Sequence, residues 1–125
     1  MPFLYALEQY PESAPINYLY ANYLVQTRNT MAEFYLLKSL EIYRLDPYPK
    51  RFVYTYGLSN YYFKTRNFPK CIKTLESNYD LSSSEIGQNY YYYDLLSKCY
   101  SSVGRQKDAE AMTLKTKFYE EMSKH

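Results

Sequence analysis

The sequence predicts an all-α protein built as a stack of antiparallel helical hairpins, with about seven helices in one domain. The first observation behind this prediction is that the 125-residue chain repeats itself at a fixed step of 38 residues. The second is that large apolar residues recur with a helical period, and no segment alternates convincingly between apolar and polar residues. The third is that only 3 Gly occur beside 19 Tyr, which argues against a loop-rich or disordered chain.

The repeat is visible in six columns of residues that keep the 38-residue step without a gap. The first column holds small residues, namely Ala21, Ser59 and Ser97. The other five columns are Tyr20, Leu58 and Leu96; Asn22, Asn60 and Lys98; Leu24, Tyr62 and Tyr100; Glu33, Cys71 and Ala109; and Leu37, Leu75 and Thr113. A fixed period of roughly 20 to 50 residues is typical of solenoids, in which each unit buries its apolar face against its neighbour.

Each repeat contains two predicted helices joined by a short polar turn. The helices are expected at about 16–27 and 31–45, at 52–64 and about 68–79, and at about 88–103 and 107–122. A further helix is expected near the start, because Leu4–Pro11 looks like the second helix of an incomplete earlier repeat. The domain therefore divides into an N-terminal helix at 1–12 and repeats at 14–47, 52–80 and 85–123.

Several residues mark the predicted helix ends. Gly104 suits a left-handed cap after the first helix of the third repeat, and Pro69 is tolerated in the first turn of the helix that it enters. Pro47 and Pro49 mark the link between the first two repeats. The stretch Ser82-Ser83-Ser84-Glu85 is expected to cap the helix that opens the third repeat.

The third repeat carries a recognisable pattern of large, small and aromatic residues. It runs through Tyr93, Leu96, Ser97, Tyr100, Gly104 and Ala109, and the second repeat has Leu58, Ser59, Tyr62 and Cys71 at matching places. This pattern resembles the tetratricopeptide repeat family over about residues 14–123. The sequence departs from the family in its period, which is longer than the usual length of roughly 34, and at Glu33, where the neighbouring Ala32 can supply the small residue.

The resemblance implies a right-handed superhelical stack that acts as a non-catalytic protein–protein interaction module or scaffold. In that family the first helix of each hairpin lines a concave groove that binds a peptide or a helix. The groove residues implied here are Tyr18, Asn22, Tyr56, Asn60, Phe63, Lys64, Tyr91, Asp94 and Lys98. The alternatives are that several of these rings simply pack between neighbouring helices, and that the lysines are ordinary solvated residues.

A second reading is a structural subunit that self-associates or docks within a larger assembly. Subunits of cell-cycle ubiquitin ligases, organelle import receptors and secretion-system chaperones of this family fit that description. No extra polar helix follows the third repeat, so the last helix is expected to expose apolar surface, which repeat proteins usually cover. Self-association or docking of this end onto a partner protein is therefore expected.

Other function classes are not expected. The single His is the terminal His125, Cys71 and Cys99 lie where packing explains them, and no phosphate-binding loop or metal-ligand spacing occurs. We therefore expect no catalysis, no cofactor, no metal and no small-molecule substrate. Acidic and basic residues are interspersed with a net charge of +2, so nucleic-acid binding is not expected. Without a long apolar run or a cysteine framework, the prediction is a reduced intracellular compartment, cytoplasmic or nuclear, and no membrane insertion.

Overall fold

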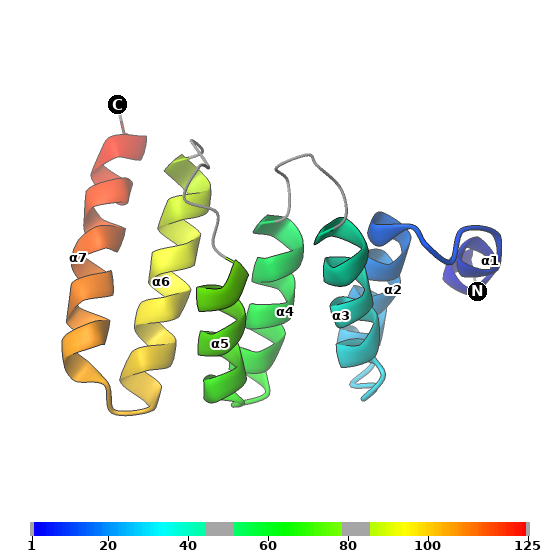
Figure 1. Cartoon of the computed structure of the whole chain (residues 1–125), viewed down its shortest axis with the longest axis horizontal. Coiled ribbons are helices and arrows are strands. Elements are labelled where there is room, and N and C mark those ends of the chain that lie inside the picture. Colours follow the sequence, from blue (N-terminus) through cyan, green and yellow to red (C-terminus); the bar gives the residue numbers. More distant parts are fainter. Residues whose placement is uncertain (1, 45–51, 79–85, 125) are drawn as a thin grey trace. The chain divides into compact units, whose positions relative to one another are not determined.

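The computed structural model of the chain describes residues 2–44, 52–78 and 86–124, and these ranges contain helices and no strand. The helices are α1 (Pro2–Gln9), α2 (Ala14–Gln26), α3 (Ala32–Arg44), α4 (Phe52–Lys64), α5 (Phe68–Asn78), α6 (Ile86–Ser102) and α7 (Gln106–Ser123) (Figure 1). All seven predicted helices are present, and the boundaries expected for the six repeat helices agree within two residues. The links predicted at Pro47 and Pro49 and at Ser82–Glu85 lie outside the described residues.

Helices that follow one another along the chain pack together in the all-α fold. The contacts join α1 to α2, α2 to α3, α5 to α6, and α6 to α7. The chain divides into two compact units, Met1–Leu58 and Ser59–His125, and the division falls inside α4. The first unit holds α1 to α3 with the start of α4, and the second holds the rest of α4 with α5 to α7.

The 38-residue period is confirmed in the backbone of the three hairpin turns. Arg28, Arg66 and Gly104 have positive φ angles of 57°, 64° and 81°. After each of them, the next amide donates to a carbonyl near the end of the preceding helix. Asn29 donates to Leu24 at 2.8 Å, Asn67 to Tyr62 at 2.7 Å, and Arg105 to Tyr100 at 2.9 Å. This is the hydrogen-bond pattern of a Schellman cap, and it confirms the cap predicted at Gly104.

The repeat register slips by one residue in the second helix of the first hairpin. Leu36 is 1% exposed and Ala32 is fully buried, whereas Leu37, which the 38-residue step aligns with buried Leu75, is 40% exposed. The reason lies in the turn, because Ala32 donates its amide to Asn29, one residue closer than the bond from Cys71 to Asn67. The sequence columns through Glu33 and Leu37 are therefore wrong for this helix, whereas the expectation that Ala32 supplies the small residue in place of Glu33 is confirmed.

Small residues let paired helices approach each other closely in the second unit. The Ser97 hydroxyl of α6 donates to the Ala109 carbonyl of α7 at 3.0 Å, and both residues belong to small-residue columns. Cys71 of α5 and Cys99 of α6 are fully buried and form a disulfide with their Cα atoms 6.8 Å apart. The sequence predicted that these two residues only pack.

The disulfide agrees poorly with the expected reduced compartment, because such bonds persist mainly where the environment is oxidising. None of the helices in the described ranges combines the length and the apolar character needed to cross a lipid bilayer.

Candidate functional site

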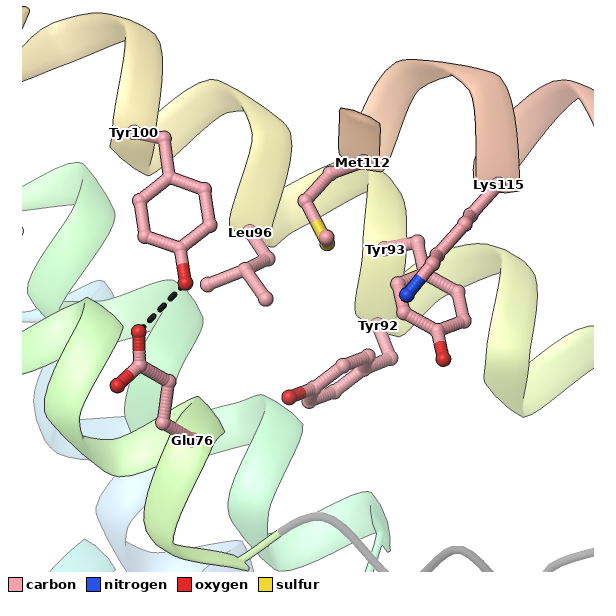
Figure 2. Close-up of a pocket in the computed structure, with 7 residues that line it drawn as sticks. All are labelled: Glu76, Tyr92, Tyr93, Leu96, Tyr100, Met112 and Lys115. Atoms are coloured by element: carbon pink, nitrogen blue, oxygen red, sulfur yellow. Dashed lines mark hydrogen bonds between the residues drawn. The ribbon is translucent and has the colours of Figure 1, made fainter. Parts of the chain in front are cut away.

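The second unit contains a cleft of about 370 Å³ between α5, α6 and α7. Its lining consists of apolar, tyrosine and charged side chains: Glu76, Tyr92, Tyr93, Leu96, Tyr100, Met112 and Lys115 (Figure 2). Tyr92, Leu96 and Tyr100 follow one another at four-residue steps on α6, so they share one face of that helix. Leu96 and Met112 form the apolar part of the lining.

A carboxylate stands at the α5 side of the cleft. The Tyr100 hydroxyl donates a hydrogen bond of 2.5 Å to Oε1 of Glu76. Burial, the hydrogen bond to Glu76 and the negative charge of Glu76 together raise the pKa of Tyr100 to about 12. Burial also raises the pKa of Tyr92, and the neighbouring tyrosines and Glu76 add to the effect. Both hydroxyls therefore remain protonated hydrogen-bond donors at neutral pH.

A cation stands at the α7 side of the cleft. The Lys115 ammonium lies 5.1 Å from the centroid of the Tyr93 ring, within the range of a cation–π interaction. Tyr93 is held in turn by Tyr119, stacked at 5.6 Å, and by Tyr92, edge-on at 5.0 Å. In Figure 2 Glu76 and Lys115 stand on opposite sides of the cleft, with Leu96 and Met112 between them.

A second cation, Arg105, lies over the ring of Tyr100. The Arg105 guanidinium lies 4.4 Å from the centroid of the Tyr100 ring, and it forms an ion pair of 2.9 Å with Asp108. Arg105 therefore holds the Tyr100 ring from the turn between α6 and α7, while Glu76 holds its hydroxyl. The Tyr100 ring is therefore contacted on its face and at its hydroxyl, which fixes its orientation in the cleft lining.

This arrangement is chemically suited to holding a ligand of mixed character. The apolar part of the lining, Leu96 and Met112, which we call the apolar floor, can contact an aliphatic or aromatic group of the ligand. Glu76 can accept hydrogen bonds from a cationic group, and Lys115 can pair with an anionic one. Among the described residues, no group of three or more His, Cys, Asp or Glu side chains is placed to hold a metal ion.

The first unit contains three of the residues predicted to line a concave groove. The Tyr18 ring lies edge-on to Tyr54 with centroids 5.3 Å apart. Its edge lies so close to Gly57 that a Cβ there would stand 2.5 Å from Cε2 of Tyr18. Tyr18 therefore takes part in packing between α2 and α4. Asn22 is partly buried, and Tyr56 lies against Phe52 at 5.8 Å.

The second unit contains the other six predicted groove residues. On α4, Asn60 is partly buried, Phe63 lies against Phe68 of α5 at 5.7 Å, and Lys64 is exposed. On α6, Tyr91 is 53% exposed. Asp94 and Lys98 form an ion pair of 3.0 Å one turn apart. The two charged residues predicted for this helix are therefore brought together as a surface pair.

None of the nine predicted residues is in the cleft lining. The helical spacing places Tyr91, Asp94 and Lys98 on the side of α6 that faces away from Tyr92 and Leu96. The nine residues are also divided between two units, so one continuous groove through all of them stays a prediction.

The sequence contained one signal for the cleft, the four-residue step of Tyr92, Leu96 and Tyr100. Leu96 and Tyr100 also belong to repeat columns, so the repeat pattern already accounts for them without a cleft. No sequence pattern singles out Glu76, Met112 or Lys115 as cleft residues. They line the cleft only because α5 and α7 pack beside α6, and the sequence spacing within one helix does not contain that information.

Comparison of this chain with protein-family models, with curated proteins and with solved structures gives no significant match.

Proposed function

We propose that this chain is a non-catalytic protein-interaction module, a stack of tetratricopeptide-like helical hairpins that binds a segment of another protein. The observation that carries the proposal is the cleft of the second unit, where an apolar floor lies between a carboxylate and an ammonium group. Such a site offers anchoring by burial and orientation by charge, which are the two requirements of specific peptide recognition.

The chemistry of the cleft defines the kind of segment that it accepts. An apolar side chain would lie on Leu96 and Met112, with a basic side chain toward Glu76 and an acidic one toward Lys115. Tyr92 and Tyr100 contribute protonated hydroxyls, and Tyr rings lose little conformational entropy when they are buried in an interface. A helical or extended peptide of mixed charge meets these requirements.

The concave groove implied by the family resemblance is a second place where a peptide could bind. Tyr91 supports it, because 53% of this large aromatic side chain is exposed on the opposite face of α6. Lys115 and Tyr91 therefore lie on different faces of the α6–α7 pair. Substituting each of them in turn shows whether a peptide binds at the cleft or in the concave groove.

The experiment is a selection of random peptides displayed on phage against the purified protein, followed by affinity measurements on two variants. Lys115→Glu should weaken binding of the selected peptides by about fivefold to tenfold, because it reverses one charge at the cleft. Tyr91→Ala should leave their affinity unchanged. Circular dichroism of both variants controls for folding.

The reverse result, in which Tyr91→Ala weakens binding and Lys115→Glu does not, would move the site to the concave groove. If no peptide is enriched above the background of an unrelated helical protein, the proposal of a peptide-binding module fails.

A further inference from the structure

Helix α7 carries an apolar stripe that its packing against α6 leaves exposed. Leu114, Phe118 and Met122 are 68%, 59% and 41% exposed. They are spaced four residues apart, so they form a single ridge along one side of the helix. The buried residues of α7, Ala109 and Thr116, lie on a different side, toward α6.

The charges beside this stripe are self-complementary. At about 100° per residue, Lys117 and Glu121 fall on the same side of the Leu114–Phe118–Met122 ridge. Both side chains are exposed. Glu121 also meets Lys124, at 3.5 Å, in an exposed pair that contributes little to stability.

A two-fold axis at Phe118 would use both features at once. In an antiparallel pair of α7 helices, Leu114 of one copy lies level with Met122 of the other, and the two Phe118 rings meet at the axis. The same rotation brings like sides of the two helices together. Lys117 of one copy is then offset from Glu121 of the other by only about 3 Å along the direction of the helices, and the two-fold symmetry makes the pair occur twice.

We propose that the Leu114–Phe118–Met122 stripe is a self-docking surface, on which the α7 of a second copy of this chain packs antiparallel with reciprocal Lys117–Glu121 ion pairs. A single helix pair buries less than the roughly 1,200 Å² of stable interfaces, so the dimer is weak, with a Kd of about 10 to 100 µM. The inference is independent of the proposed function, because it concerns a different face and requires no peptide.

The first test is sedimentation equilibrium of the purified chain from about 5 to 500 µM, a range chosen around the expected Kd. The wild type should show a monomer–dimer equilibrium. Phe118→Asp should weaken the dimer by at least about tenfold, because it places a charge at the centre of the apolar contact. The matched control is Phe34→Asp, since Phe34 on α3 is similarly exposed at 54%, and it should leave the equilibrium unchanged.

The second test is reversal of the flanking charges, which preserves the apolar stripe and the fold. Lys117→Glu alone and Glu121→Lys alone should each weaken the dimer by about fivefold, because each turns two attractive pairs into repulsive ones. The double variant Lys117→Glu/Glu121→Lys should restore the wild-type Kd. A mixture of the two single variants should form a heterodimer in preference to either homodimer.

Three results would overturn the proposal. The first is a wild type that remains monomeric throughout the concentration range. The second is a dimer that Phe34→Asp disrupts and Phe118→Asp does not. The third is a double charge variant as weak as the single ones, because that result excludes the reciprocal antiparallel pairing. Peptide binding at the cleft is measured separately, so its failure would not be confused with any of these results.

Discussion

At the scale of single residues, the three hairpin turns place different amino acids in the same backbone conformation. Arg28 and Arg66 have positive φ angles, as Gly104 does. An L-residue with a Cβ pays a steric cost in the left-handed region that glycine avoids. The first two turns therefore adopt the cap geometry despite their side chains, while the third has the residue that suits it.

This difference predicts opposite effects of glycine at equivalent positions. Arg28→Gly and Arg66→Gly should each stabilise the protein by up to about 1 kcal/mol, because the backbone strain is removed. Gly104→Ala should destabilise it by about 1 kcal/mol for the same reason. A Cβ at Gly104 would meet no atom within 4 Å, so the effect reports the backbone alone. Urea unfolding at equilibrium measures all three, and a destabilising Arg66→Gly would contradict the strain argument.

At the scale of elements, α2 and α4 depend on one close approach within the first unit. A Cβ at Gly57 would stand 2.5 Å from Cε2 and 2.9 Å from the hydroxyl oxygen of Tyr18. Glycine is a poor helix former, and its cost relative to alanine is about 1 kcal/mol. The helix tolerates this cost because the Tyr18 ring occupies the space that a side chain would need.

A double-mutant cycle tests this contact. Gly57→Ala alone should destabilise the protein by about 1 to 2 kcal/mol, because the clash with the ring outweighs the gain in helix propensity. In a Tyr18→Ala background the same substitution should stabilise the protein by up to about 1 kcal/mol, since the clash is absent. Thermal and urea unfolding of the four proteins give the coupling, and a Gly57→Ala effect of the same sign in both backgrounds would reject the contact.

The disulfide between Cys71 and Cys99 joins α5 and α6 across a sequence separation of 28 residues. Closing a loop of this length in the unfolded chain is worth about 3.5 kcal/mol in the chain-entropy account. Reduction with dithiothreitol should therefore lower the free energy of unfolding by about that amount. The Cys71→Ala/Cys99→Ala variant is the control, because its stability should not respond to the reductant. Equal stability of the oxidised and reduced wild type would show that the bond contributes nothing.

At the scale of the whole molecule, the pH dependence of folding follows from the buried tyrosines of the second unit. The folded-state pKa of Tyr100 is about 12, above its ordinary value of 10.0, and that of Tyr92 is raised as well. The folded protein therefore holds these protons more tightly than the unfolded chain does. The stabilisation is fully present below pH 10, and it is lost as the pH rises through 10 toward 12.

Tyr100→Phe isolates this contribution. At neutral pH the variant should be less stable than the wild type by about 1 kcal/mol, because the hydrogen bond to Glu76 is lost. The difference should shrink as the pH rises above 10, since the wild type alone has the Tyr100 proton to lose. Urea unfolding at pH 7 to 11 measures it, with the exposed Tyr91→Phe as the control. A difference that stays constant over this range would contradict the raised pKa.

Much of the fold could be predicted from the sequence, because it depends on local and periodic properties. Helical spacing of apolar residues located seven helices, and the 38-residue step located three turns whose backbones repeat at Arg28, Arg66 and Gly104. The sequence indicated the one-residue slip at Ala32, because Glu33 departs from the column of small residues. It did not indicate that the slip continues to Leu36, since the slip arises from a hydrogen bond to the Asn29 carbonyl that spans one residue fewer than its counterpart at Asn67.

By itself, the sequence determined the helices, their hairpin pairing along the chain and the positions of the turns, because these follow from spacing within one segment. Only the tertiary structure decided which side chains meet. In the structure Cys71 forms a disulfide with Cys99, and Tyr18 packs against Gly57. Glu76, Tyr100 and Lys115, which belong to three different helices, line one cleft. The physical reason is that burial and charge pairing depend on distances between helices, which no periodicity along a single helix contains.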